Sequence, residues 1–493
     1  MLYSSTRSAT GPYVTSAEAI KRGLAPDGGL YMPAEIPQID EDELYELSGM
    51  PYPERAARIL GKFLSDYTEE ELLSDCREAY GEERFPGGAA PLSDIDGTTV
   101  ALELWHGPTC AFKDMALQIM PRLLSRALRK TGERKTALIL VATSGDTGKA
   151  ALEGYRDVPQ TKIQVFYPVD GVSRVQKLQM ATQTGDNVNV TAIRGNFDDA
   201  QTGVKTIFSD PSIREKLAGR GVILSSANSI NWGRLAPQIA YYVSAYCDLV
   251  STSRIEMGET VDVTVPTGNF GNIFAAYLAK KMGVPLGRLI CASNRNDVLT
   301  EFFACGVYDR NRSFHTTMSP SMDILISSNL ERLLFVRFGA RRCKALMEQL
   351  NATGTYALTH EELTALRADF IGYSADETKT AEAIRLAWEA GYLADPHTAV
   401  GYAAIRADRN ARDRSRKILL ASTASPYKFA ANVYRSLTGK EPGSDLSALR
   451  ELSSLTSTPI PAPLVGIGER TVRFTGTAAP EEMPERVLAF AGL

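Results

Sequence analysis

A lysine stands where a strand should turn into a helix. The segment ELWHGPTCAFKDMALQ (103–118) ends a strand at Trp105, turns through Gly107–Pro108 and reaches Lys113 directly before Asp114. A lysine at a helix N-terminus lies against the positive end of the helix dipole and packs on apolar neighbours, and both effects favour the neutral amine. A neutral amine can condense with a carbonyl group, so Lys113 is a candidate nucleophile. The alternative is a surface lysine beside an aspartate, which most such triplets are.

A glycine-rich loop follows the apolar strand TALILV. The segment ATSGDTGKAALEGY (142–155) opens a helix, so free backbone N–H groups and the positive helix end would face an anion. A nucleoside-triphosphate loop requires glycine where Thr143 stands and serine or threonine where Ala150 stands, which excludes that kind of site. A carboxylate or a cofactor oxygen is the better ligand, and a plain tight turn is the alternative.

A second glycine-bearing loop, PTGNFGNIFAAYLAK (266–280), follows another apolar strand, VDVTV. Its glycines leave the backbone open to a phosphate group. The pattern is weak by itself. Together with the first loop it predicts two helix ends directed at anions in one α/β protein.

Polar side chains gather at a third strand–helix junction, SSANSINWGRLAPQ (225–238). It offers Asn228, Ser229, Asn231 and Arg234. The guanidinium group has the rigid fork that suits a phosphate, and the other side chains add hydrogen bonds. The alternative is that Ser229 or Asn231 caps the helix while Arg234 lies in solvent. The segment alone does not decide between these two interpretations.

These loops belong to a series of alternating strands and helices. The strand candidates are mostly continuous apolar or β-branched runs: Thr99–Trp105, Thr136–Ala142, Ile163–Tyr167, Val188–Ile193, Val222–Ser226, Val261–Val265, Arg288–Ala292 and Lys417–Ser422. Such runs are typical of parallel strands covered on both faces, which indicates an α/β fold. We expect short helices over 16–80, a mainly helical region over 323–388, a short strand at Thr471–Thr475 and a solvated helix end or loop at 406–417.

Composition excludes several classes of protein. The chain has 493 residues, enough for several domains, and a net charge of -4, which argues against a nucleic-acid partner. The six cysteines form no CxxC pair and the four histidines form no cluster, so we expect free thiols in a reducing cytoplasm and no metal site. No secretory signal and no apolar run of membrane-spanning length is visible, so we expect a cytoplasmic protein with no membrane partner.

Taken together, the motifs resemble those of the threonine synthases, in the branch that includes bacterial and fungal enzymes. The resemblance spans most of the chain and is carried, in order, by GLAPDGGLYMP, HGPTCAFKD, ATSGDTGKAA, NSINWGR, PTGNFGN, NRND, DPHTAVGYAA and STASPYKF. Each motif is weak, but eight in the right order are highly specific.

The resemblance implies a fold of the tryptophan-synthase-β type, the type II fold of pyridoxal-phosphate enzymes. Two α/β domains would face each other across the cofactor, preceded by an N-terminal domain. We expect that domain over 1–90, the catalytic region over 91–440 with the smaller α/β domain at about 140–255 nested within it, and a C-terminal extension over 441–493.

The resemblance also assigns residues. Lys113 matches the lysine that holds pyridoxal phosphate as a Schiff base, and Lys149 is a distant second choice. The other cofactor residues implied are Gly268, Asn269, Phe270, Gly271 and Asn272 at the phosphate, Asp146 near the ring oxygen, and Thr423 at the pyridine nitrogen. The residues implied for the substrate are Thr143, Ser144, Gly145 and Thr147 at its carboxylate, and Asn228, Ser229, Asn231 and Arg234 at its phosphate.

The reaction implied is the conversion of O-phospho-L-homoserine and water to L-threonine and phosphate by a monomer or homodimer. A related lyase that releases a 2-oxo acid and a catalytically silent binding protein are the alternatives. One departure bears on them: the family's last motif commonly reads TAHPAKF, whereas Ser425 and Tyr427 stand here in TASPYKF. No role of that histidine can be carried over.

Overall fold

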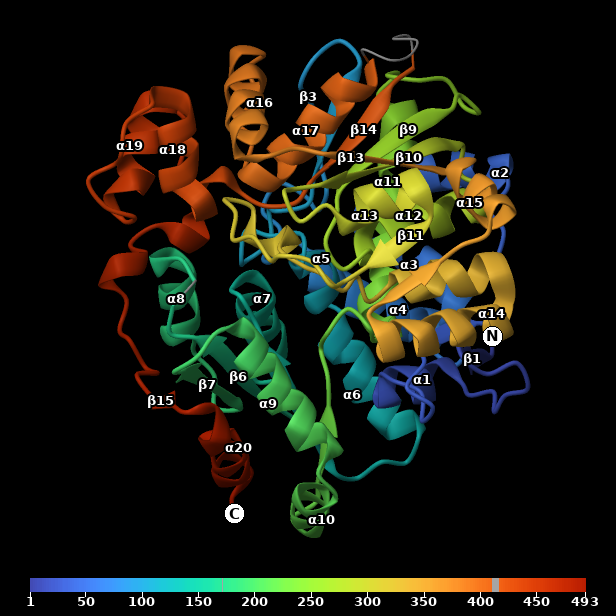
Figure 1. The fold of residues 1–493 in the computed structure, drawn as a ribbon, viewed down its shortest axis with the longest axis vertical. Helices are drawn as coiled ribbons and strands as arrows, with labels where there is room; N and C mark the ends of the chain where they lie inside the picture. The colour runs from blue at the N-terminus through green and yellow to red at the C-terminus, as the bar shows by residue number, and fades with distance from the viewer. Residues whose placement is uncertain (171, 410–415) are drawn as a thin grey trace.

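The computed structural model describes residues 1–170, 172–409 and 416–493, and two β-sheets dominate it (Figure 1). The larger sheet has the strand order β13-β10-β9-β14-β4-β3, with only β3 antiparallel to its neighbour. Its strands are β3 Leu92–Asp94, β4 Thr99–Glu103, β9 Val261–Pro266, β10 Leu286–Ser293, β13 Phe370–Ser374 and β14 Ile418–Ser422.

The large sheet is buried on both faces, which explains why its strands read as continuous apolar runs. Alternate residues of β14 serve different cores. Leu419 and Ala421 pack with α11 (Trp232–Ser251) and α12 (Gly271–Lys281), whereas Ile418 and Leu420 pack with α16 (Glu377–Glu389) and α17 (Pro396–Arg409).

The smaller sheet is parallel, with the strand order β15-β7-β6-β5-β8. Its strands are β5 Thr136–Ala142, β6 Thr161–Pro168, β7 Val188–Ile193, β8 Val222–Ser225 and β15 Thr477–Ala478. The helices that pack around it are α7 Asp146–Tyr155, α8 Arg174–Ala181, α9 Phe197–Ser209, α10 Pro211–Gly219 and α20 Met483–Ala491. In Figure 1 this unit lies below and to the left of the large sheet.

The N-terminal region packs against α11 of the large-sheet unit. It consists of β1 Tyr3–Ser5, β2 Tyr31–Pro33, α1 Ser16–Arg22, α2 Glu41–Ser48, α3 Tyr52–Phe63 and α4 Glu69–Tyr80, as the short helical pattern predicts. The other elements are α5 Asp114–Leu117, α6 Met120–Lys130, α13 Val298–Cys305, β11 Val307–Asp309, η1 Pro320–Met322, α14 Leu330–Thr353, β12 Thr355–Ala357, α15 His360–Arg367, η2 Pro426–Phe429, α18 Ala430–Thr438, α19 Ser447–Thr456, η3 Ala462–Leu464, η4 Ile467–Glu469 and η5 Pro480–Glu482.

The C-terminal segment connects the two units. Helix α18 packs on α16, and α19 packs on α18. The chain then descends along the left of Figure 1 and adds β15 to the edge of the small sheet. Helix α20 then buries Met483 and Val487 in the core formed with α9 and α10. The segment from 441 onward is therefore structurally part of both units.

The structure confirms the eight strand predictions within a few residues at each end, and it corrects two others. Residues 471–475 form no strand, and β15 begins two residues later at Thr477 because only there does the chain reach β7. Within the region expected to be mainly helical, Phe370–Ser374 forms the edge strand β13. The charged stretch 406–417 lies partly outside the described residues.

The cysteines, the possible metal ligands and the apolar helices bear on the classes of protein considered above. All six cysteines are unpaired. Among the described residues, no group of three or more histidine, cysteine or carboxylate side chains is arranged so that it could bind a metal ion. Within that same part of the chain, no helix combines the length and apolar character needed to cross a bilayer.

Candidate active site

Lys113 is presented by a tight turn at the end of β4. The turn is closed by Asp114, whose carboxylate accepts hydrogen bonds from the Thr109 N–H and hydroxyl, each at 2.8 Å. A Cβ atom at Gly107 would lie 2.6 Å from the Asp114 carboxylate, so only glycine fits there. The Phe112 N–H donates to the Thr423 carbonyl oxygen at 2.8 Å, which fastens the turn to the end of β14.

The Lys113 side chain is buried at the predicted helix start, one residue before α5. Its Nζ lies 3.5 Å from Ser321 Oγ, 3.9 Å from Asp146 Oδ2 and 4.7 Å from the centre of the Phe112 ring. Burial lowers the pKa of this amine to about 8, and the nearby cations Lys428 and Arg234 act in the same direction against Asp146. At pH 7 about one tenth of such an amine is neutral, compared with about one part in three thousand at the ordinary lysine pKa of 10.5.

Lys149 is held differently. Its Nζ donates to Glu153 Oε2 at 3.0 Å and also to the Gln183 side chain. An amine committed to a close ion pair is a poorer nucleophile than the loosely held Lys113. The geometry therefore favours Lys113 over Lys149.

The loop at 143–147 is closed by its own threonine. The Thr143 hydroxyl accepts hydrogen bonds from the N–H groups of Gly145 at 3.0 Å and Gly148 at 2.9 Å. Gly145 has φ 138°, and a Cβ atom there would lie 2.5 Å from the Gln176 amide. This turn directs Asp146, the first residue of α7, toward Lys113, while Ser144 and Thr147 stay partly exposed.

Asp146 is a buried carboxylate surrounded by donors. Gln176 Nε2 donates to its Oδ1 at 2.8 Å, Ser321 Oγ donates to its Oδ2 at 3.1 Å, and Lys428 Nζ lies 2.6 Å from Oδ1. Burial alone would raise the pKa of Asp146, but the cations Lys428 and Lys113 outweigh burial and hold that pKa well below its usual range. The group is thus a permanent anion.

The loop at 268–272 joins β9 to α12. Phe270 has a left-handed φ of 65° and precedes the helix with no side-chain cap, so the first N–H groups of α12 are left for another acceptor. A Cβ atom at Gly268 would lie 2.8 Å from the Ser321 carbonyl, and the Asn269 carbonyl accepts from Asn329. Asn272 Oδ1 accepts from the two hydroxyls of Tyr241 and Tyr242, whereas its buried Nδ2 has no partner in the described structure.

The junction at 228–234 contains residues with two kinds of role. Asn231 caps α11 through the Gly233 N–H at 2.9 Å and donates to the Ile20 carbonyl at 2.9 Å. Arg234 is 3 % exposed, donates to the Ala227 carbonyl and has a buried Nε without a partner among the described residues. Burial lowers the pKa of this guanidinium to about 10. Asn231 therefore acts as the helix cap, as one of the two interpretations predicts, whereas Arg234 is buried and remains suited to bind an anion.

Several residues of the site were not singled out from the sequence. Arg332 in α14 donates to the carbonyls of Ser229 at 3.3 Å and Ile230 at 2.6 Å and so shapes the junction at 228–234. Ser321 links Lys113 to Asp146, and its N–H donates to His397 Nε2 at 3.2 Å. Arg332 in α14 and Ser321 in η1 are remote in sequence from the loops that they contact, so no local spacing pattern could have identified them.

Thr423 and the two unusual residues after it lie close together. Thr423 directly follows β14, is 5 % exposed and is fixed by its backbone to Phe112. Ser425 is buried and caps η2 by accepting from the Tyr427 N–H at 3.3 Å. The Tyr427 hydroxyl bonds to Thr458 in the C-terminal segment at 2.7 Å. Both replacements therefore have structural partners.

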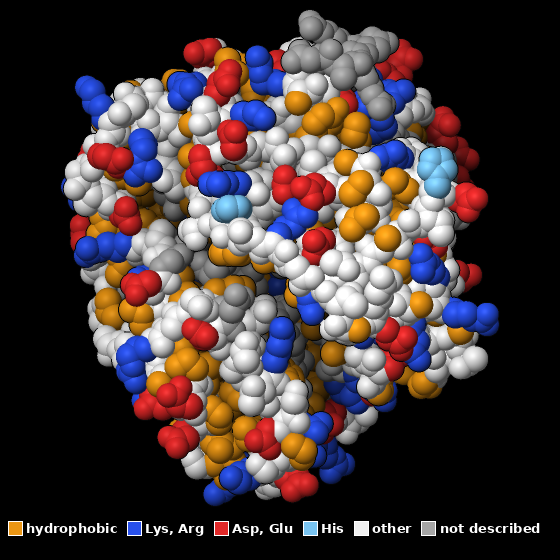
Figure 2. All heavy atoms as spheres, viewed as in Figure 1, with side chains coloured by type: hydrophobic (Ala, Val, Ile, Leu, Met, Phe, Trp, Pro, Cys, Tyr) orange, Lys and Arg blue, Asp and Glu red, His pale blue; other side chains and the backbone are white. Residues whose placement is uncertain are grey.

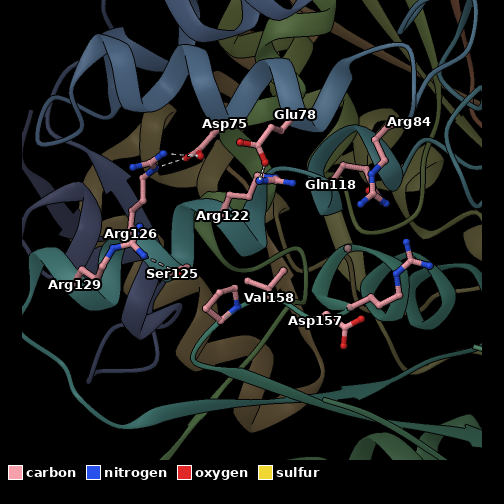
Figure 3. Close-up of a pocket in the computed structure, with 13 residues that line it drawn as sticks. Asp75, Glu78, Arg84, Gln118, Arg122, Ser125, Arg126, Arg129, Asp157 and Val158 are labelled. Atoms are coloured by element: carbon pink, nitrogen blue, oxygen red, sulfur yellow. Dashed lines mark hydrogen bonds and ion pairs between the residues drawn. The ribbon is translucent and has the colours of Figure 1, made fainter. Parts of the chain in front are cut away.

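Two hollows must be distinguished. Figure 2 shows the surface hollowed between the parts of the molecule built on the large and small sheets. A separate polar hollow of about 360 Å³ lies between α4, α6 and the end of α7 (Figure 3). Its arginines are largely paired already, for example Arg126 with Asp75 at 2.6 and 2.9 Å and Arg122 with Glu78. The reactive groups belong to the site around Lys113.

The site fits pyridoxal phosphate, which carries an aldehyde and a phosphate. Lys113 offers a buried amine of lowered pKa, and the start of α12 offers uncapped N–H groups beside the unpartnered Asn272 Nδ2. Both groups follow strands, β4 and β9, whose carboxyl ends lie at the same edge of the large sheet. The fold and the site together define a pyridoxal-phosphate-dependent enzyme of the type II fold.

Known proteins specify the class further. Family models match residues 2–80 (Threonine synthase N terminus), 88–423 (Pyridoxal-phosphate dependent enzyme) and 398–487 (Threonine synthase, C-terminal). Threonine synthase of Pseudomonas aeruginosa is 41 % identical over 448 residues, which cover 90 % of this chain and 92 % of that protein. The crystal structure of the pyridoxal-phosphate-bound threonine synthase of Brucella melitensis superposes with a TM-score of 0.88 at 36 % identity and covers 100 % of both chains. The chain belongs to the threonine synthase family.

A further relative has a different length. Human Threonine synthase-like 1 is also 41 % identical, over 86 % of this chain, but the match covers only 58 % of the human protein.

Proposed function

We propose that this chain converts O-phospho-L-homoserine and water to L-threonine and phosphate, the last step of threonine biosynthesis. Within a pyridoxal-phosphate enzyme of this family, the observation that carries the substrate assignment is Arg234. It is a buried guanidinium near Lys113 whose Nε has no partner in the described structure. A buried cation of this kind needs an anion, and the substrate phosphate supplies one.

The residues that would hold the cofactor surround Lys113. Lys113 Nζ would bind its aldehyde carbon, the loop 268–272 its phosphate, Asp146 would lie near its ring oxygen and Thr423 near its pyridine nitrogen. When bound, pyridoxal phosphate supplies an electron sink for negative charge that develops on the substrate carbons. The turn closed by Asp114 and the contact between Phe112 and Thr423 keep Lys113 at a fixed position for this purpose.

Lys113 also provides the base. When Lys113 is not bound to the cofactor, its neutral Nζ would be able to take the proton from the substrate Cα. Its pKa of about 8 makes the amine easier to deprotonate than an ordinary lysine and lets the same nitrogen return protons to later carbon centres. A proton is next removed from Cβ, the γ-phosphate leaves Cγ with its bridging oxygen, and Cγ gains a proton. Water then adds its hydroxyl group at Cβ while a proton returns to Cα. The net change is one water consumed and one phosphate released.

The two anionic ends of the substrate would be held by different loops. We assign the carboxylate to the segment formed by Thr143, Ser144, Gly145 and Thr147, and the phosphate to Asn228, Ser229, Asn231 and Arg234. Thr143 and Asn231 use their side chains to shape these loops, and their backbone N–H groups already donate to the carbonyls of Phe166 and Asn228, so these two residues would act mainly by holding the loop conformation. Arg234 would contribute the only full positive charge from these eight residues.

A lyase is the second candidate. It would use the same groups to release phosphate but would let the unsaturated product leave as 2-oxobutanoate and ammonia. The observation in its favour is Ser425, which stands where the family commonly has histidine. Against a catalytic effect, Ser425 uses its hydroxyl to cap η2.

Product analysis with O-phospho-L-homoserine separates the candidates. The synthase gives L-threonine equal to the released phosphate. Phosphate accompanied mainly by 2-oxobutanoate and ammonia would establish the lyase, and no phosphate release would mean a silent binding protein. We further propose that the enzyme acts in the cytoplasm as a monomer or homodimer, in keeping with its six unpaired cysteines.

A further inference from the structure

A second lysine is buried beside Lys113. Lys428, in η2, is 1 % exposed, and its Nζ donates to the Thr109 carbonyl at 2.9 Å and lies 2.6 Å from Asp146 Oδ1. Placing a lysine in the interior is unfavourable unless its charge is balanced and its protons are bonded. The substrate and cofactor roles proposed above do not use this residue, so its position calls for a separate explanation.

Asp146 lies between the two lysines and is much closer to one of them. Its Oδ1 is 2.6 Å from Lys428, whereas its Oδ2 is 3.9 Å from Lys113. Ser321 occupies the wider gap, since its hydroxyl donates to Asp146 at 3.1 Å and accepts from Lys113 at 3.5 Å. The close ion pair is therefore Asp146–Lys428, and Lys113 is left at the edge of it.

This arrangement affects how readily Lys113 loses its proton. After burial, the influences on Lys113 are the carboxylates Asp146 and Asp114, which favour its cation, and the cations Lys428 and Arg234, which disfavour it. The interaction with His397 also lowers the pKa of Asp146. Without Lys428, the amine of Lys113 would be the remaining lysine partner of Asp146. Lys113 would then be drawn into the protonated form.

We propose that Lys428 is a positioning residue for Lys113: its cation neutralises Asp146 and thereby leaves the Lys113 amine free to be neutral. The inference rests on the proposed role of Lys113 as the cofactor lysine. A purely structural role is the competing explanation, because Lys428 also pins the Thr109 carbonyl in the turn that precedes Lys113. Charge at position 428 distinguishes the two.

The test measures the proton affinity of Lys113 directly in cofactor-free full-length protein. Trace acetylation by acetic anhydride between pH 6 and 10, read by mass spectrometry of the Lys113 peptide, gives the pH at which the amine becomes reactive. We expect a midpoint near pH 8 in the unaltered protein. In Lys428→Met the midpoint should rise by about one pH unit or more, a tenfold fall in the neutral fraction at fixed pH.

Two comparisons make the result specific. Lys428→Arg keeps the charge, so its Lys113 midpoint should stay near that of the unaltered protein. Lys149, which is paired with Glu153, is an internal reference whose reactivity should not move in any variant. An unchanged midpoint in Lys428→Met would overturn the proposal, as would an equal rise in Lys428→Arg, because either result would mean that the charge has no part in the effect.

Asp146→Asn provides a second, opposite test that does not require Lys428→Met to fold. It removes the attraction on Lys113 and leaves the repulsion by Lys428, so the midpoint should fall below that of the unaltered protein. A midpoint that stays the same or rises would contradict the proposal. Because the labelling uses neither cofactor nor substrate, its outcome is independent of whether threonine is the product.

Discussion

Lys113, Lys428 and Arg234 are cationic side chains buried in one site, and their neighbours treat each of them differently. Lys428 is balanced by Asp146 at 2.6 Å. Lys113 is driven toward the neutral form by burial. Arg234 keeps its charge, since even its lowered pKa of about 10 is far above neutrality. The site therefore separates a base, a fixed ion pair and an anion receptor by environment alone.

The pKa of Lys113 sets the pH dependence of cofactor capture. Only the neutral amine attacks an aldehyde, so the rate at which cofactor-free protein binds pyridoxal phosphate should rise about tenfold per pH unit below pH 8 and level off above it. Stopped-flow absorbance measures this rate, and Lys113→Met is the control that should show no covalent capture. A midpoint near the ordinary lysine value of 10.5 would contradict the buried environment.

The role of Arg234 is tested by a change that keeps charge and removes geometry. In Arg234→Lys we expect kcat/KM for O-phospho-L-homoserine to fall about tenfold, roughly 1.4 kcal/mol, because the fork that binds two phosphate oxygens is lost. Phosphate release assays measure this effect. The matched control is Arg254→Lys, at an arginine that pairs with the exposed Asp94. Loss of bound cofactor in Arg234→Lys would mean that this residue serves the cofactor instead.

At the scale of the element, the strand-to-helix turns do most of the positioning. Lys113, Asp146 and the loop 268–272 all follow the carboxyl ends of parallel strands, β4, β5 and β9. Each turn has a glycine that tolerates no Cβ atom: Gly107 against Asp114, Gly145 against Gln176 and Gly268 against Ser321. The glycines are needed because other chain segments approach the backbone closely at these places.

Gly145 offers the clearest test of this idea. Its φ is 138°, and a methyl group added to its Cα would lie 2.5 Å from the Gln176 amide. Gly145→Ala should therefore lower the free energy of unfolding by about 1–3 kcal/mol and shift Asp146 at the start of α7. Urea denaturation measures the loss. Gly219→Ala, at a helical glycine with open space around it, is the matched control and should be nearly neutral. Equal stability of the two variants would refute the argument.

The sequence predicts the elements better than the contacts between them. The strands that carry Lys113, Asp146 and the phosphate loop are evident from their apolar runs. Lys428 could not be identified as part of the site from the sequence. Its role depends on the ion pair with Asp146, which is far away in the sequence and is brought close to Lys428 only by the fold. Edge strand β13 was missed because five residues beside long helices give little periodicity.

At the scale of the whole molecule, the C-terminal segment ties the small sheet to the large one. Met483 is completely buried in the core shared by α9, α10 and α20. Met483→Ala should therefore destabilise the small-sheet unit by about 2–5 kcal/mol. Faster hydrogen exchange of the β7 amides would report it. Val472→Ala, at a residue 45 % exposed in the same segment, is the control. The same exchange rates in both variants would show that α20 contributes little.

The position of β15 in the chain has a consequence for synthesis. The strands β5, β6, β7 and β8 leave the ribosome in one continuous stretch, but the strand that completes their sheet is made after the whole large-sheet unit. Until Thr477 and Ala478 emerge, the end of β7 at Ala192 and Ile193 lacks its partner strand, and an open strand edge can pair with another chain. During synthesis the small sheet therefore has a longer open edge than in the finished molecule, and this edge could pair with another chain.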